Sequence, residues 1–262
     1  MGTQPLLQES TSDTQELVRA SLQMKDCQGS IDPLLNPGQD KLYYIEISHD
    51  IPIAQECVEY KTVHELPLFN NLRKEFSEIF SNLMPLLIAK DAQLHRHSLR
   101  VHSLALSFTT TTLQLPEAES LKIGLAAFFH DIGKMHIHDA ILQKASSLSR
   151  EEYEIIKYHP AYGAEILSQF KLINSVIPAL YHHHERLDGK GYPDGLRGNA
   201  IPLGARIIAI VDAFEVMTSH RIYQESRTPM QAIEELFENA GTQFDAELVT
   251  LFYKFLQMSL RI

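Results

Sequence analysis

Residues 121–134 read LKIGLAAFFHDIGK, an apolar stretch that leads into a His-Asp pair. Its apolar residues, from Leu121 to Phe129, recur at the spacing of one helix face. The dipeptide His130-Asp131 follows where this helix is predicted to end. An imidazole beside a carboxylate offers two metal ligands from one rigid element, and a carboxylate can bridge two cations. The same dipeptide can also be hydrogen-bonded and solvated at a helix end, so by itself it leaves both interpretations open.

A second stretch, residues 181–195, reads YHHHERLDGKGYPDG and follows another apolar segment. Neighbouring helical positions point about 100° apart, so three consecutive histidines cannot all be buried in one core. At a helix end, two of them can converge on a pair of metal ions. Gly189, Gly191 and Gly195 permit positive φ angles and a close approach of the backbone to a ligand. An exposed polar helix end is the competing interpretation of the histidines.

Helix signals recur through most of the chain. Pro116 and Ser149 mark helix starts, and Glu152 completes a capping box with Ser149. Pro160 fits the first turn of the next helix, which places His159 at the junction. Further helices are predicted over residues 203–221, 229–238 and 245–257.

The N-terminal residues differ from the rest. Residues 1–66 carry no chemical motif, and their first part is rich in Gln, Ser, Asp and Thr. Lys41–Ser48 and Ile51–Tyr60 are compatible with one or two short strands. We therefore predict a mainly α protein, with a small and partly flexible N-terminal region (1–66) before a helical bundle domain (67–262).

Composition limits the function classes. Apolar residues make up 44% and charged residues 21%, which is typical of a globular protein. The net charge of −10 argues against sequence-independent binding of DNA or RNA, which needs many Lys and Arg contacts to phosphate. No apolar run is long enough to span a bilayer. Two cysteines, Cys27 and Cys57, make no disulfide framework, so the cytoplasm is the expected compartment.

Of the 13 histidines, 11 fall between His95 and His220, and the motifs around them resemble a known family. HDIGK at 130–134 and HHERLDGKGYPDG at 183–195 are similar to the two signatures of the HD-GYP family. HSLRV at 97–101, His159-Pro160 and GTQFD at 241–245 fit the same frame. Family members are helical HD-type phosphodiesterases that hydrolyse cyclic di-GMP with bound metal ions.

The resemblance implies a ligand set for two divalent metal ions, with iron or manganese favoured. Asp131 bridges the two ions in this expectation. One ion is held by His97, His130, Asp131 and Asp212, and the other by Asp131, His159, His183 and His184. Some members hold a third ion with a Glu at the position of Gln93; an amide is a weaker ligand, so two ions are expected here.

The resemblance also implies how substrate is bound and cleaved. Two cations about 3.5–4 Å apart lower the pKa of a bridging water, and the resulting hydroxide attacks the phosphate in line with the 3′-oxygen. The expected catalytic residues are Asp131 and Lys134. Substrate is expected to contact Lys134, Gly191, Tyr192, Pro193 and Arg221. The expected products are pGpG, GMP or both.

Alternatives remain open. The chain could be a non-catalytic cyclic di-GMP receptor, a protein-interaction module using the GYP loop, or a phosphodiesterase for another cyclic dinucleotide. Gln224, His220 and Ile222 depart from the residues frequent near Arg221, which puts phosphate affinity or base preference in doubt. Glu185 is expected to orient His183 or His184. Surface or packing roles are expected for His95, His102, His136, His138, His182 and His220. The N-terminal region is the expected regulatory part, and a homodimer or a regulatory protein partner is left open.

Overall fold

The structure is a computed structural model that describes residues 91–144, 146–170, 173–219 and 226–260, together with Leu83, Ile88 and Lys90. The predictions for residues 1–66, including their short strands and the boundary after residue 66, lie outside the described residues. Arg221, His220, Ile222 and Gln224 lie outside them as well.

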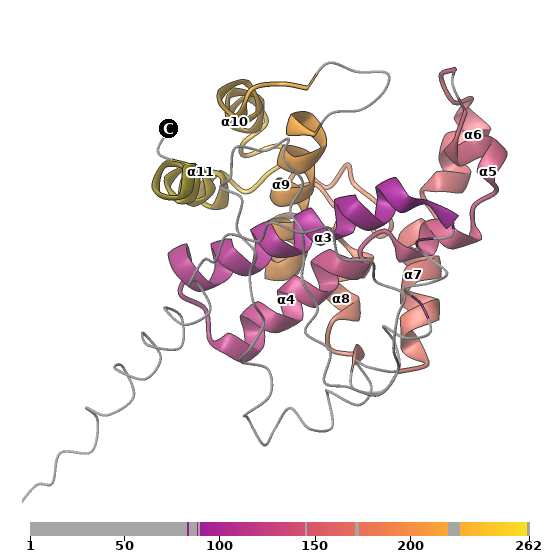
Figure 1. Cartoon of the computed structure of the whole chain (residues 1–262), viewed down its shortest axis with the longest axis horizontal. Helices are drawn as coiled ribbons and strands as arrows, with labels where there is room; N and C mark the ends of the chain where they lie inside the picture. Colours follow the sequence, from indigo (N-terminus) through magenta and orange to yellow (C-terminus); the bar gives the residue numbers. More distant parts are fainter. Residues whose placement is uncertain are drawn as a thin grey trace, which may run out of the picture. The chain divides into compact units, whose positions relative to one another are not determined.

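The described part is helical and contains no β-strand, which confirms the mainly α prediction (Figure 1). Its longer helices are α3 (Ala92–Ser107), α4 (Glu117–Phe129), α7 (His159–Ser168), α9 (Leu203–Thr218), α10 (Pro229–Glu238) and α11 (Ala246–Leu260). Its shorter elements are the π-helical η2 (Phe108–Thr112), the 3₁₀ turns η3 (Ile132–His136) and η5 (Gly198–Ala200), and the helices α5 (Asp139–Leu142), α6 (Arg150–Ile156) and α8 (Ile177–Tyr181).

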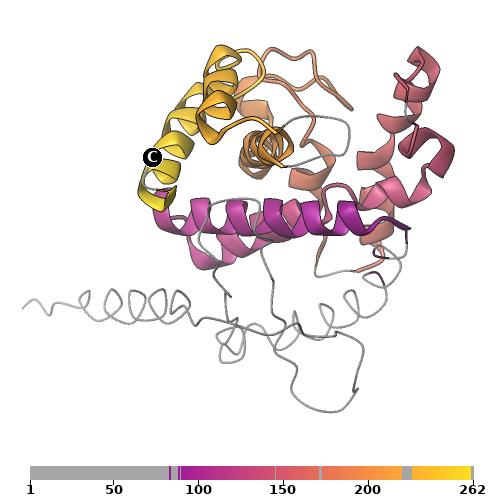
Figure 2. The ribbon, with the colours of Figure 1, turned by 45° about the horizontal axis from the view of Figure 1, so that its top comes forward.

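The core forms where α3 packs against α4 and α9, and where α11 closes over η2 and α9. Phe108, Phe214 and Phe252 are fully buried there. The ring of Phe252 lies edge-on to both of the others, with centroids 5.2 Å and 5.3 Å apart. Figures 1 and 2 both show α10 and α11 at one end of the helical domain and α5 and α6 at the other. The helices between these ends, α3, α4, α7, α8 and α9, are therefore the ones that can surround a central site.

Most of the predicted helix starts are confirmed. Pro116 precedes α4, Ser149 and Glu152 form the capping box of α6, and His159 is the first residue of α7. Helix α10 has the predicted bounds, and α11 runs three residues beyond its predicted end.

The predicted end of the long helix at residue 221 is wrong, because α9 ends at Thr218. Ser219 leaves the helix with extended backbone angles, φ −78° and ψ 139°. Its amide N–H still donates to the Glu215 carbonyl (2.9 Å), and its hydroxyl donates to the Glu215 carboxylate. These two bonds satisfy Ser219 without a further helical turn. None of the described helices is long and apolar enough to cross a membrane.

Candidate metal centre

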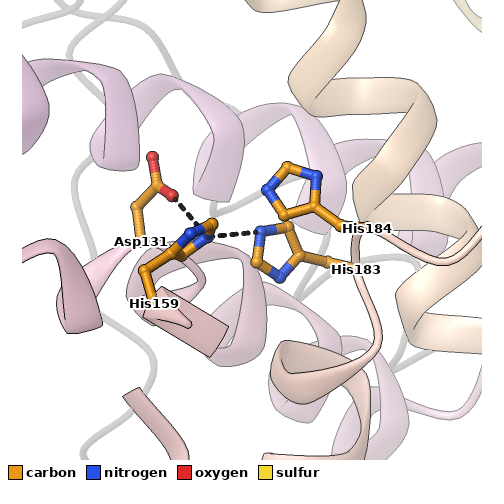
Figure 3. Close-up of side chains that lie close together, drawn as sticks. All are labelled: Asp131, His159, His183 and His184. Atoms are coloured by element: carbon orange, nitrogen blue, oxygen red, sulfur yellow. Dashed lines mark hydrogen bonds and ion pairs between the residues drawn. The ribbon is translucent and has the colours of Figure 1, made fainter. Parts of the chain in front are cut away.

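Seven side chains from five helical segments converge between α3, α4, α7, α8 and α9. They form two groups, and within each group the candidate ligand atoms lie within 4.8 Å of one another. One group comes from the turn after α4, the start of α7 and the turn after α8, and consists of Asp131, His159, His183 and His184 (Figure 3). The other comes from α3, the end of α4 and α9, and consists of His97, His130 and Asp212. All seven predicted ligand residues are thus brought together.

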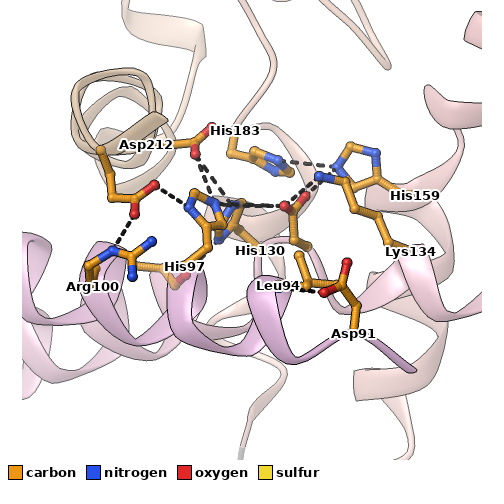
Figure 4. Close-up of polar contacts among 12 residues, drawn as sticks. Asp91, Leu94, His97, Arg100, His130, Lys134, His159, His183 and Asp212 are labelled. Carbon is orange, nitrogen blue, oxygen red and sulfur yellow. Dashed lines mark hydrogen bonds and ion pairs between the residues drawn. The ribbon is translucent and has the colours of Figure 1, made fainter. Parts of the chain in front are cut away.

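Asp131 has contacts in both groups, of which Figure 4 labels His97, His130 and Asp212 on one side and His159 and His183 on the other. Its Oδ1 is 3.2 Å from Nε2 of His159 in the first group. Its Oδ2 is 3.4 Å from Nε2 of His130 and 3.8 Å from Nε2 of His97 in the second. One carboxylate therefore presents a different oxygen to each group, which is the arrangement that a bridging ligand requires.

A glycine contact places Asp131 beside His159. A Cβ added to Gly133 would lie 1.9 Å from the His159 carbonyl oxygen and 2.5 Å from the Gly163 amide nitrogen. Only a residue without a side chain allows η3 to approach the start of α7 this closely. The Gly in HDIGK is therefore required by the packing of two ligand-bearing segments.

The ring nitrogens are oriented for metal binding. His130, His159 and His183 each donate Nδ1–H to the backbone carbonyl three residues earlier in the chain, at 2.5–2.7 Å. This tautomer leaves a lone pair on each Nε2. Two Nε2 pairs face each other, His97 with His130 at 3.2 Å and His159 with His183 at 3.3 Å. A cation between such nitrogens would relieve their mutual repulsion.

Two buried carboxylate oxygens also face imidazole nitrogens, at 3.2 Å for Asp131 and 3.1 Å for Asp212. Oδ1 of Asp131 and Oδ1 of Asp212 accept no hydrogen bond from the described residues. Buried polar atoms are nearly always hydrogen-bonded or otherwise satisfied, and a bound cation would satisfy these two oxygens. Neutral imidazoles and carboxylates without thiolates suit divalent Fe, Mn, Co, Ni or Zn. The residues present therefore fit a pair of divalent ions.

The electrostatics keep His183, His184 and Asp131 in the protonation states that metal ligands need, whereas His97 binds a proton more tightly in the metal-free protein. Burial and the neighbouring His184 hold the pKa of His183 well below its ordinary value, and burial together with His159 lowers the pKa of His184 to about 3. Burial would raise the pKa of Asp131, but the charge of Lys134 and the contacts with neighbouring imidazoles outweigh it and hold that pKa well below the ordinary value. At neutral pH the two imidazoles are therefore uncharged and Asp131 is ionised.

Lys134 lies at the edge of this site. It follows Asp131 by one 3₁₀ turn, and its Nζ donates to Oδ2 of Asp131 at 2.5 Å. The side chain remains 27% exposed, so the ammonium group is accessible from solvent beside the carboxylate.

The role expected of Glu185 is wrong. Its carboxylate turns away from the imidazoles and accepts the backbone N–H groups of Asp194, Gly195 and Leu196, at 2.7, 2.9 and 3.1 Å. A buried carboxylate that accepts three amides holds the loop against the histidine turn. Position in the sequence beside His184 could not reveal this, because it does not say which way the side chain points.

The glycine-rich loop behaves as its composition predicts. Gly189 and Gly195 have positive φ angles of 74° and 66°. Gly191 allows close contact instead, because an added Cβ would lie 2.4 Å from the Arg186 amide nitrogen and 2.6 Å from the His184 carbonyl oxygen. The loop is therefore packed directly on the histidine turn.

This packing places Tyr192 on the metal site. Its ring stacks on His184, with centroids 4.8 Å apart and an interplanar angle of 27°. The Tyr192–Pro193 peptide bond is cis. Nζ of Lys157 lies 5.8 Å from the centroid of the Tyr192 ring. The predicted substrate residues of this loop thus border the imidazole cluster.

Two histidines outside the ligand set have the packing roles expected of them. His102 Nδ1 lies 2.7 Å from the Gly124 carbonyl oxygen, and its ring meets the edge of Phe128. His182 pairs with Asp194 at 3.0 Å. Gln93 lies in the first turn of α3, four residues before His97 as predicted, and its side chain is exposed.

Sequence reasoning missed Glu215. It lies in α9 three residues after Asp212, is fully buried, and contacts both His97 and Arg100. The spacing of charged residues could have indicated it. Arg100 follows His97 by three residues on α3, and Glu215 follows Asp212 by three residues on α9. Residues three apart share a helix face, so Arg100 and Glu215 each lie on the face that carries a ligand.

Comparisons with known proteins agree with this centre. The HD domain family matches residues 81–248. The cyclic di-GMP phosphodiesterase response regulator RpfG of Xanthomonas campestris pv. campestris is 43% identical over 139 residues, which cover 52% of this chain and 37% of that protein. The 3′3′-cGAMP-specific phosphodiesterase 2 of Vibrio cholerae is 35% identical over 192 residues, which cover 72% of this chain and 37% of that protein. The chain thus spans little more than a third of the length of these relatives.

A solved structure supports the fold. The protein Bd1817 of Bdellovibrio bacteriovorus, described as an HDG"Y"P protein, superposes with a TM-score of 0.53 at 20% identity and covers 71% of this chain and 69% of its own. With the HD domain match over residues 81–248 and the HDIGK and HHERLDGKGYPDG motifs in place at the centre, this chain belongs to the HD domain family as an HD-GYP member.

Proposed function

We propose that this protein is a metal-dependent phosphodiesterase that hydrolyses cyclic di-GMP to pGpG, GMP or both, and that it acts in the cytoplasm. The observation that carries the proposal is the position of Asp131, with one oxygen toward each of two imidazole groups. The names of the relatives support the reaction class, since RpfG is a cyclic di-GMP phosphodiesterase.

Two divalent ions, iron or manganese, fit the two groups. His97, His130 and Asp212 would hold one, His159, His183 and His184 the other, and Asp131 both. Bound there, a pair of such ions lowers the pKa of a shared water and neutralises charge on the attacked phosphate.

The remaining roles belong to side chains around the ions. Lys134 supplies a positive charge beside Asp131, where an anionic phosphate needs one. Tyr192 offers an aromatic face near His184, against which a purine base can stack, while Gly191 and Pro193 shape the loop that carries it. Arg221 would add a second cation for the phosphates.

A second substrate has specific support. Among the relatives, a 3′3′-cGAMP-specific phosphodiesterase is 35% identical over 192 residues, about as similar as a cyclic di-GMP phosphodiesterase of Thermotoga maritima that is 36% identical over 199 residues. Cyclic GMP-AMP contains the same 3′,5′-linked ring with one guanine replaced by adenine. We therefore rank 3′3′-cGAMP as the alternative substrate of the same site.

The test is direct incubation of purified, manganese-loaded or iron-loaded protein with each cyclic dinucleotide in parallel. Chromatography identifies the products, and Asp131→Ala serves as the control for contaminating activity. The proposal is supported if the unmodified protein converts cyclic di-GMP and Asp131→Ala does not. Tight binding without turnover under every metal condition would favour a receptor instead.

A further inference from the structure

Glu215 is a buried anion whose role the proposed reaction does not yet include. It projects from α9, and its side chain has no exposed surface. Oε2 accepts the Nδ1–H of His97 at 2.5 Å. Oε1 accepts from Nε of Arg100 and from the Ser219 hydroxyl.

These contacts explain how a carboxylate stays ionised inside the protein. Burial would raise the pKa of Glu215, but its hydrogen bonds to His97 and Ser219 and the charge of Arg100 outweigh that effect and lower the pKa. A buried charge is tolerated when it is paired and hydrogen-bonded in this way. The Glu215 carboxylate therefore lies directly behind the His97 ring, hydrogen-bonded to it and held by Arg100 and Ser219.

His97 differs in this respect from the other imidazoles. His130, His159 and His183 each donate Nδ1–H to a neutral backbone carbonyl. An anionic acceptor fixes the ring more firmly than a carbonyl and makes the opposite nitrogen a stronger donor to a metal. Nε2 of His97 points to Asp212, with 3.1 Å between Nε2 and Oδ1.

We propose that Glu215 is the positioning residue of the metal position formed by His97, His130 and Asp212, and that the position formed by His159, His183 and His184 does not depend on it. The inference rests on the proposed two-metal site. It predicts that the two positions differ in metal affinity, and that the affinity of one of them depends on the Glu215 carboxylate.

The experiment measures metal content and affinity rather than turnover. Glu215→Gln keeps the size of the side chain but removes the charge. The protein is equilibrated with Mn²⁺ buffered at the lowest free concentration that fills both positions of the unmodified protein. Elemental analysis is then expected to give two ions per chain for the unmodified protein and one for Glu215→Gln. Competition with a fluorescent chelator should show one affinity unchanged and the other weakened roughly 10–100-fold, as for other partners of metal-bound histidines.

Double variants identify the position that is lost. Asp212→Asn should remove the same ion, so adding Glu215→Gln to it should cause no further loss. His184→Ala acts on the other position, so its combination with Glu215→Gln should leave no ion. Glu235→Gln is the control. Glu235 lies in α10, away from the site, and also pairs with an arginine, Arg227. Its replacement should leave both ions bound.

Folding is checked separately, because Glu215→Gln leaves Arg100 without its counter-charge. The double variant Arg100→Met with Glu215→Leu removes both charges at similar volume, and it should also hold one ion while retaining the helical circular dichroism of the unmodified protein. Two ions of unchanged affinity in these folded variants would overturn the inference but leave the proposed function intact. An unmodified protein that binds no divalent ion would instead overturn the proposed function.

Discussion

Replacing Glu185 should detach the GYP loop from the metal site without emptying it. In Glu185→Ala, three backbone N–H groups lose a carboxylate that accepts them at 2.7–3.1 Å. Hydrogen bonds to a charged group contribute about 1.5–3 kcal/mol each, so the three together set an upper limit of about 9 kcal/mol. Asp194 is exposed and water can rehydrate part of the loop, so we expect a loss of about 2–4 kcal/mol in the free energy of unfolding.

Urea unfolding, metal analysis and kinetics on one preparation test this prediction. KM should rise, because Tyr192 is carried by the released loop, whereas the metal content should stay at the unmodified value. Glu165→Ala, an exposed position on α7, is the control. Unchanged stability and KM in Glu185→Ala would refute the reasoning, and loss of metal would show that the loop supports the ions directly.

Four further outcomes are expected. Asp131→Ala should abolish turnover and lower metal content, and Asp131→Asn should be nearly as severe, because an amide is a poor bridge between cations; near-normal turnover would contradict the two-metal assignment. Tyr192→Ala should lower kcat/KM but leave the metal content unchanged, even though the Tyr192 ring stacks on His184. Elemental analysis and kinetics on the same sample test this prediction. Protein purified with excess manganese should hold two ions, since Gln93 brings no charge for a third; three would contradict it. In metal-free protein, burial would lower the pKa of His97, but Asp212 and Glu215 outweigh burial and raise that pKa to about 9. The protonated ring therefore stabilises the folded state fully below about pH 6.5, and this stabilisation is lost as the pH rises through 9. The melting temperature, measured at several pH values, should fall across this range.

Five of the seven ligands were predictable from sequence because they lie in short motifs at helix ends, whereas His97 and Asp212 lie within α3 and α9. His130-Asp131 and His183-His184 are adjacent pairs, and the start of the helix at His159 followed from Pro160. Taken singly these motifs left other interpretations open, and their resemblance to the two HD-GYP signatures, in the same order, supplied the expected ligand set.

Long-range contacts were not predictable in the same way. Glu215 is 118 residues from the ring that it contacts, and its spacing from Asp212 does not say which residue it meets. The end of α9 depends on the same carboxylate, because Ser219 bonds to it as the helix stops. Glu185 was wrongly assigned since adjacency to a ligand does not give the direction of a side chain.

The candidate ligands also have a consequence for how the chain reaches its native state. They span residues 97–212 and come from segments that become neighbours only when α3, α4, α7, α8 and α9 have packed together. Contacts between residues so distant in sequence close late, because a large loop entropy opposes them. An ion that binds only the native arrangement stabilises it by mass action and acts as a reversible cross-link between helices. Cellular metal supply should therefore set the lifetime of the folded protein as well as its activity.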